Sequence, residues 1–279
     1  MNWPPGFFPP IEVCGGPSWG INLPPCFKTR PAQHDNSASF NPSRGISEIP
    51  EPERAVLVAL AHAINETSIL NSLLIVSSRF EDDQLQVAYA QAIQMYSLTR
   101  MLAGKLHETW IAIESGYFRS QLSKKYHNQL DDKSIESLRA LKKYFSRRNL
   151  ISDIRNGLAF HFSLKSASIL PRDEINDDDL SFYVGPNRRN SLYVFSETVM
   201  NTTLMELTHS VTMAEAFAKF IGEINFVDKH LNIFADNWIY FVLASKIGDK
   251  VLWSSEEEID IGEVPLYENL AIPFFFDVT

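Results

Sequence analysis

Residues 51–80 read EPERAVLVALAHAINETSILNSLLIVSSRF, and this stretch decides the fold class that the sequence predicts. Proline suits the first turn of a helix, because the backbone N–H that it lacks has no partner there. Apolar residues follow at helical spacing, at Val56, Leu60, Ile64, Leu70 and Leu74. The pattern predicts an amphipathic α-helix with one face in a core.

A second long helix is predicted for residues 82–118, which begin with two acidic residues that favour a helix N-terminus. Its apolar stripe consists of Leu85, Tyr89, Ala92, Tyr96, Met101, Leu102, Leu106 and Trp110. Because a short connection joins it to the first helix, we expect the two to form an antiparallel pair.

Shorter helices follow in the middle of the chain. Residues 119–127 fit one turn of helix, and DKSIESLRALKKYF fits a longer one with Asp131 or Asp132 as its N-cap. The next helix is expected to start near Asn149.

A final long helix is predicted from about residue 197 to 248, broken near Gly222. Its apolar side is expected to comprise Leu204, Leu207, Val211, Ala214, Ala218 and Ile221.

Two short strands interrupt this helical pattern. After the acidic stretch DEINDDDL, the segment LSFYVGPNRRNSLYVF fits strands on either side of a Gly-Pro-Asn turn. We therefore predict a mainly all-α protein with a small β-hairpin insertion at about residues 178–195.

The ends of the chain differ from its middle. Residues 1–50 carry ten of the 15 prolines, so we expect a Pro-rich, disordered tail there. The predicted helical domain spans residues 51–250, and residues 251–279 are expected to form an irregular C-terminal segment.

Composition limits the functions that fit. The formal charge of −9 argues against a protein that coats nucleic acid non-specifically, so any contact with nucleic acid is expected to be local. Cys14 and Cys26 lack metal-binding or disulfide-framework spacing. The N-terminus resembles no signal peptide, and the sequence is interpreted as having no 18-residue apolar run that could span a bilayer. We expect a soluble, cytoplasmic protein with no membrane association.

Residues 151–163, ISDIRNGLAFHFS, contain an arginine followed directly by asparagine and, six residues after the arginine, by histidine. This pattern resembles the signature of the HEPN superfamily, whose Arg-x4-6-His motif lies on a helix. The surrounding LKKYFSRRNLISDIRNGLAFHF and the earlier LAGKLHETW are also similar to a group of uncharacterised bacterial helical proteins with that signature. The resemblance covers residues 53–245 as a helical layout, and it implies a HEPN-like helical bundle.

The resemblance implies a metal-independent endoribonuclease, of the toxin or defence kind, that leaves 2′,3′-cyclic phosphate ends. His161 would be the acid or base, Arg155 would hold the phosphate, and Asn156 would orient them. These residue types suit the chemistry, since histidine titrates near neutral pH and arginine binds phosphate through two N–H groups. No cofactor is implied. The implied partners are RNA, a second copy of the chain, and an antitoxin or regulatory protein.

Helix geometry also favours a dimer. On a regular helix, positions 155 and 161 project about 120° apart and lie about 9 Å apart along the axis. One helix therefore does not bring the two side chains together, whereas two facing copies of the motif would. Gly157 departs from good helix-forming sequence, because a mid-helix glycine costs about 1 kcal/mol relative to alanine. It either permits a close approach by a second helix or RNA, or loosens the helix.

A basic segment precedes the motif. Between Ser137 and Ser152 there is no acidic residue, and the basic residues are Arg139, Lys142, Lys143, Arg147 and Arg148. They fit contacts to an RNA backbone, and they equally fit an ordinary solvated helix face. Tyr144 and Phe145 fit either base stacking or, for Phe145 above all, core packing.

Other interpretations stay open. Asn156 and His161 would be internal hydrogen-bonding residues, and Arg155 would pair with a carboxylate such as Asp153, in a protein without a catalytic site. The alternative functions are a non-catalytic HEPN-like protein that binds RNA or nucleotide, and a helical protein-interaction module.

A metal site is not predicted. Glu206 and His209 match the Glu-x-x-His spacing of di-iron bundles, but those sites need a second such pair and further carboxylates. His62, His107 and His230 are interpreted as surface or core residues. The sequence contains no nucleophile-elbow, P-loop, dinucleotide-binding or zinc-protease motif.

Overall fold

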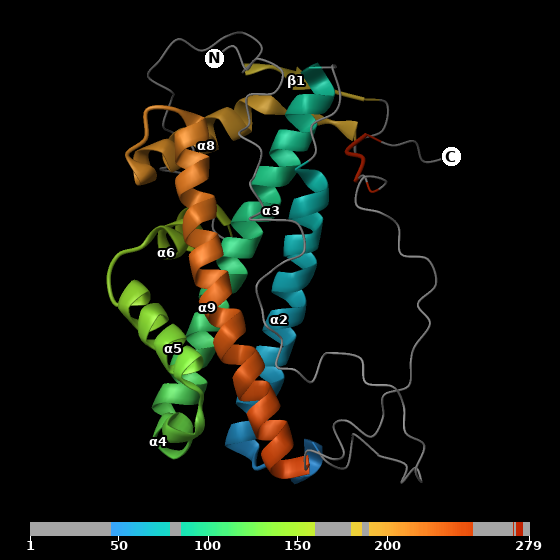
Figure 1. Cartoon of the computed structure of the whole chain (residues 1–279). Helices are drawn as coiled ribbons and strands as arrows, with labels where there is room; N and C mark the ends of the chain where they lie inside the picture. The colour runs from blue at the N-terminus through green and yellow to red at the C-terminus, as the bar shows by residue number, and fades with distance from the viewer. Residues whose placement is uncertain are drawn as a thin grey trace, which may run out of the picture.

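The computed structural model describes residues 46–78, 85–159, 180–185, 190–247, 270 and 272–275. Within these ranges the protein is mainly α-helical, with one two-stranded antiparallel sheet, which confirms the predicted all-α class with a small hairpin. Three long helices run side by side along the molecule: α2 (Glu51–Ser77), α3 (Leu85–Ala112) and α9 (Met213–Ile247) (Figure 1). The core lies between them. Of the tail expected at residues 1–50, residues 1–45 lie outside the described residues, as do nearly all of residues 251–279. Residues 46–50 are described, and Ile49 is buried in the core.

Helix α2 begins where the sequence predicts, with Pro50 at the N-cap and a second proline in the first turn. Four of the five predicted apolar positions are buried, and Ile64 packs against the core from its edge. Of the helices that the structure describes, α2 alone is long and apolar enough to cross a membrane by length and composition. Its buried apolar residues belong to the core shared with α3 and α9, and 22% of the apolar window is buried.

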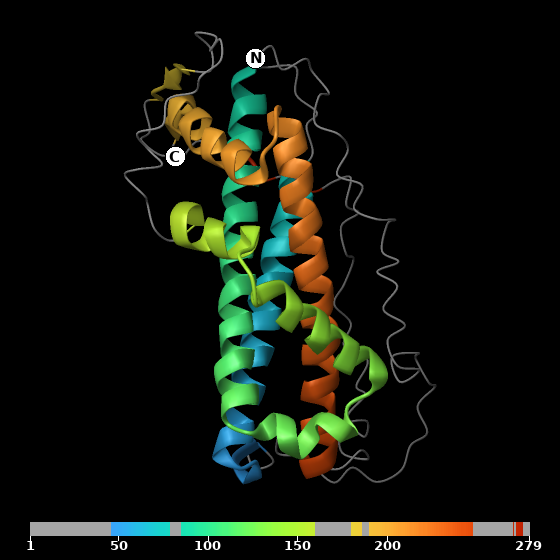
Figure 2. The ribbon, with the colours of Figure 1, turned by 90° about the vertical axis from the view of Figure 1, so that its left-hand side faces the viewer.

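Helix α3 runs antiparallel to α2, as expected (Figure 2). Most of its predicted stripe is buried, but Leu85 and Met101 are exposed, at 40% and 44%, so their assignment to the core was wrong. Position 101 is directly beside Leu102 and therefore projects about 100° away from it. The helix continues as a π-helical turn, Ile113–Arg119, that packs on α2 so closely that a Cβ at Gly116 would lie 2.7 Å from Val56 Cγ2.

A chain of short elements then returns across the long helices (Figure 2). It comprises α4 (Leu122–Tyr126), a 3₁₀ turn (His127–Gln129), α5 (Asp132–Phe145) and α6 (Leu150–Ile154). Asp131 is the N-cap of α5, because its carboxylate accepts a hydrogen bond from the Ser134 N–H at 2.7 Å. Asn149 caps α6 in the same way, at 2.9 Å from the Ser152 N–H. Both starts agree with the sequence.

The motif segment is not a regular α-helix beyond residue 154. It continues as a π-helical turn, Arg155–Ala159, where the described stretch ends. The expected regular geometry therefore does not hold here. The π-helical turn packs against α3, which positions Arg155 beside that helix.

The hairpin consists of β1 (Phe182–Tyr183) and β2 (Leu192–Tyr193), in antiparallel register with Phe182 opposite Tyr193. Leu192 and Val194 pack on Ala90 of α3 and form a second, smaller core. The Gly-Pro-Asn turn lies largely outside the described residues.

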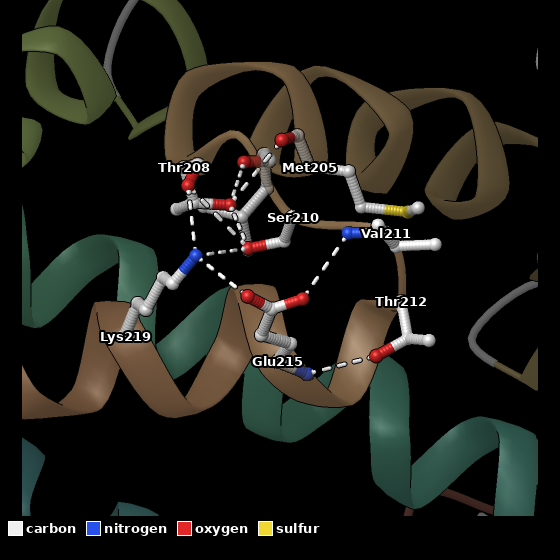
Figure 3. Close-up of polar contacts among 8 residues, drawn as sticks. Met205, Thr208, Ser210, Val211, Thr212, Glu215 and Lys219 are labelled. Atoms are coloured by element: carbon white, nitrogen blue, oxygen red, sulfur yellow. Dashed lines mark hydrogen bonds and ion pairs between the residues drawn. The ribbon is translucent and has the colours of Figure 1, made fainter.

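The predicted final helix is two helices, and the predicted break at Gly222 was wrong. Helix α8 (Val194–Thr208) ends at His209, whose φ of 50° is left-handed, and α9 runs unbroken through Gly222. A polar network fixes the turn (Figure 3): Thr212 Oγ1 accepts from the Glu215 N–H, and Glu215 Oε2 accepts from the Val211 N–H, both at 3.2 Å. Thr212 and Glu215 thus form a variant of the capping box.

The break also shifts the apolar face of α9. Val211, expected on the buried side, is 82% exposed, and Ala218 is exposed as well. The residues of α9 that enter the core are Met213, Ala216, Phe217, Phe220, Ile224, Val227, Leu231, Phe234, Ala235, Trp238 and Val242. Because the chain turns at His209, the helical spacing of apolar residues in α8 does not continue into α9.

Candidate functional site

Arg155 is the best-defined residue of the motif. Its Nη2 lies 2.7 Å and its Nε 2.9 Å from Oε1 of Glu108 on α3, while Nη1 donates to Asn156 Oδ1 at 2.9 Å. The side chain remains 29% exposed. A guanidinium carries five N–H donors, so these contacts leave donors on its outer edge for a ligand.

Of the other two predicted site residues, Asn156 and His161, the structure describes only Asn156. Asn156 is exposed and holds the Arg155 guanidinium through its side-chain oxygen. His161 lies outside the described residues, so its distance from Arg155 stays a prediction, as does the dimer. Gly157 is described, and a Cβ built on it would meet nothing within 4 Å, so no described element approaches it closely.

The carboxylate partner of Arg155 differs from the one that the alternative interpretation named. Asp153 pairs instead with Arg148, at 2.8 Å. Glu108 is far from Arg155 in sequence, and only the docking of the Arg155–Ala159 turn on α3 brings them together.

His107 is a neighbour of this cluster that the sequence analysis assigned only to the surface or the core. Its Nδ1 is buried without a hydrogen-bond partner and lies 3.9 Å from Glu108 Oε1. Burial lowers the pKa of His107 below its usual value, the positive charge of Arg155 lowers it further, and Glu108 opposes both effects. The lowered pKa favours the neutral imidazole, which can accept a proton.

A cleft of about 420 Å³ lies between α3, the π-helical turn after it, α5 and α6. His107 borders it, and so does Ser152, one helical turn before Arg155. The remaining lining residues are Trp110, Ile111, Glu114, Phe118, Arg119, Lys142, Phe145 and Ser146. The cleft and the Arg155 cluster are thus adjacent.

The predicted basic residues divide between two places. Arg139, Lys142 and Lys143 are all exposed, and their spacing of three and four residues puts them on one face of α5. Arg147 and Arg148 are exposed in the turn between α5 and α6. Of the five, only Lys142 lines the cleft.

The two aromatic residues beside this basic face are packed inside. Tyr144 is buried and donates a hydrogen bond to Glu223 of α9. Phe145 is half-buried and stacks on Trp110, with ring centroids 5.0 Å apart and ring planes within 7°. Tyr144 is thus part of the α5–α9 contact, whereas Phe145 also forms part of the cleft wall.

Within the ranges that the structure describes, no group of three or more His, Cys, Asp or Glu side chains could hold a metal ion. His209 of the Glu-x-x-His pair ends α8 in a left-handed conformation instead of continuing the helix. Regular helix spacing therefore does not apply to Glu206 and His209.

Sequence analysis missed His107 and Glu108 as neighbours of the motif. The segment LAGKLHETW was noted for its resemblance, but nothing in one sequence says which turn of α3 lies against Arg155. A basic-aromatic cleft formed by four elements has no linear signature.

No protein-family model, no curated protein and no solved structure matches this chain. The class of this protein is therefore defined by its fold and its candidate site alone. It is a mainly α-helical protein with an Arg155–Glu108–Asn156 cluster next to an aromatic cleft bordered by cationic side chains.

Proposed function

We propose that this protein is a metal-independent endoribonuclease of HEPN type, with Arg155, Asn156 and His161 as its site residues. Two copies of the motif would face each other in a homodimer, and the RNA products would carry 2′,3′-cyclic phosphates. The observation that carries the proposal is the setting of Arg155: a preorganised, partly exposed guanidinium with free donors beside a cleft.

Preorganisation matters because catalysis of phosphoryl transfer depends on cations fixed where charge develops. Glu108 and Asn156 hold the guanidinium from two sides, so its orientation is set before a phosphate arrives. The exposed basic face of α5 supplies the long-range attraction that an otherwise acidic protein needs to approach RNA.

His107, whose pKa is lowered by burial, adds an imidazole beside Glu108. A neutral imidazole suits proton transfer from a 2′-hydroxyl. In the proposed reaction His161 is the acid or base. The biological setting that we propose is a cytoplasmic toxin or defence effector restrained by an antitoxin or regulatory protein.

A second candidate function is RNA binding without cleavage. The ion pair between Arg155 and Glu108 favours it, because a carboxylate that already neutralises the guanidinium weakens its attraction for a phosphorane. The two functions predict different outcomes when the protein is incubated with RNA: cleavage in the first case, and binding without cleavage in the second.

The test incubates the full chain with a labelled single-stranded RNA in the presence of a chelator. We expect cleavage to 2′,3′-cyclic ends, abolished by His161→Ala and reduced at least about a hundredfold by Arg155→Ala, in line with the loss of one transition-state donor. Lys133→Ala, an exposed lysine on α5 outside the basic segment, is the matched control.

Cleavage that persists in folded His161→Ala protein contradicts the ribonuclease assignment. RNA retention that weakens with salt, without cleavage at any protein concentration, supports the second function. Circular dichroism of each variant establishes that the fold is intact.

A further inference from the structure

The cleft beside Arg155 has an aromatic wall. Trp110 and Phe145 stack in parallel at 5.0 Å, and Phe118 tilts against Trp110 with centroids 6.1 Å apart. All three rings line the cleft. Because Trp110 and Phe145 cover each other's faces and Trp110 is buried, the wall offers a planar ligand the edges of these rings and the half-buried sides of Phe118 and Phe145.

The same cleft has an uncompensated positive charge. Arg119 is paired with Glu114, at 3.6 Å, so those two charges offset each other. Lys142 lies over the ring of Phe118, its ammonium 5.4 Å from the centroid, and within the described part of the chain no carboxylate pairs with it. The cleft therefore has one cation free for an anionic group.

Size and polarity agree with a small ligand. A volume of about 420 Å³ falls within the range of small-molecule sites, roughly 300–1,000 Å³. Two serines, Ser146 and Ser152, and the half-buried His107 add hydrogen-bonding groups beside the aromatic wall. Apolar walls with a few polar groups are the usual composition of a binding pocket.

We propose that this cleft binds a planar aromatic ring joined to an anionic group, with the ring against the Trp110–Phe145 wall and the anion at Lys142. One nucleotide unit has this chemistry, and so does an aromatic carboxylate. The proposal stands apart from RNA cleavage, because it concerns binding by residues other than Arg155, Asn156 and His161.

The experiment is calorimetric titration of the full chain with four probes. Adenosine 5′-monophosphate carries ring and anion, adenosine only the ring, inorganic phosphate only the anion, and 4-hydroxybenzoate is an aromatic anion that is not a nucleotide. We expect at least one of the two aromatic anions to bind about tenfold or more tightly than adenosine and phosphate, as one charge-assisted hydrogen bond implies.

Variants locate the site. Lys142→Ala is expected to weaken binding of the aromatic anion about tenfold, and Lys142→Arg to retain it, because the charge is kept. Lys133→Ala, on the same helix but away from the cleft, is expected to bind as the unaltered chain does. Preference for the monophosphate assigns the site to a nucleotide, and preference for the carboxylate assigns it to an aromatic acid.

Three results would overturn the proposal: no binding of either aromatic anion at millimolar concentration, adenosine binding as tightly as its monophosphate while 4-hydroxybenzoate does not bind, or equal effects of Lys142→Ala and Lys133→Ala. None of them bears on cleavage. A chain that binds the probe yet leaves RNA intact contradicts only the ribonuclease proposal, and one that cuts RNA without binding a probe contradicts only this one.

Discussion

Arg155 donates its Nε–H to Oε1 of Glu108 at 2.9 Å, and its Nη2 forms an ion pair with the same oxygen at 2.7 Å. The contact joins the π-helical turn after α6 to the C-terminal part of α3. Both side chains are partly exposed, at 29% and 46%, so solvent screens the pair and it contributes only about 0.5–1 kcal/mol to stability. An interaction of this strength orients a guanidinium more than it stabilises the fold.

The Arg155–Glu108 ion pair predicts that substitutions of its two residues change RNA affinity in opposite directions. Glu108→Gln removes the negative charge beside the phosphate site and is expected to tighten RNA binding several-fold, whereas Arg155→Ala is expected to weaken it about tenfold. Affinity is measured by fluorescence anisotropy at fixed salt. Glu66→Gln, which breaks a similar ion pair with Lys105, is the matched control. Looser RNA binding by Glu108→Gln would contradict the prediction.

Three glycines are expected to respond differently to alanine. A Cβ at Gly157 or Gly222 meets nothing within 4 Å, so each substitution should stabilise the protein by about 0.5–1 kcal/mol through helix propensity. At Gly116 the Cβ would lie 2.7 Å from Val56 Cγ2, and overpacking costs about 1–3 kcal/mol. Urea unfolding of the three variants checks the order. If the Gly116→Ala and Gly222→Ala variants were equally stable, the prediction would be contradicted, because α2 would then shift away from the added methyl group at little energetic cost.

The turn between α8 and α9 is expected to depend on its cap. Thr212→Ala loses the hydrogen bond from the Glu215 N–H and should destabilise the protein by about 1 kcal/mol. Thr202 in α8 donates instead to the Thr198 carbonyl, so Thr202→Ala should be nearly neutral. Thermal unfolding compares the two variants. If Thr212→Ala and Thr202→Ala lost equal stability, the loss would come from the threonine methyl groups and not from the helix cap.

Stability is expected to depend on pH through Asp228, which is buried on α9. Burial raises the pKa of Asp228 to about 6, although hydrogen bonds from Asn232 and Asn71 favour the charged form. A raised pKa means that the folded state holds a proton that the unfolded state releases above about pH 4. The stabilisation is therefore complete below pH 4 and is lost as pH rises through 6.

Asp228→Asn stays neutral and should lack this dependence. Its free energy of unfolding, compared with that of the unaltered chain, is expected to gain about 2–3 kcal/mol between pH 4 and pH 7. Only this change with pH is diagnostic, because the amide also alters local hydrogen bonds. Glu136→Gln, an exposed residue on α5, controls for the loss of one negative charge. A constant difference across that pH range would contradict the raised pKa.

Local patterns in the sequence determined the helical class, the starts of α2, α5 and α6, and the hairpin. Each of these depends on neighbours in the chain: a proline in the first turn, an Asp or Asn side chain that caps an N–H three residues on, or the repeat of apolar residues along one face. Most of the apolar residues that these patterns named on α2 and α3 lie in the core, whereas none of those that α9 contributes was named. They also singled out Arg155 and Asn156, which the structure places in one hydrogen-bonded cluster.

The break between α8 and α9 also has a local cause, because Thr212 and Glu215 cap the start of α9 and stand three residues apart in the sequence. Tertiary structure decided the candidate site. Glu108 pairs with Arg155, and Lys142 shares a cleft with Trp110, only because the chain folds α5 and α6 back across α3. Such contacts join residues far apart in the chain, and their distances depend on how whole helices pack. The sequence of any one segment does not contain that information.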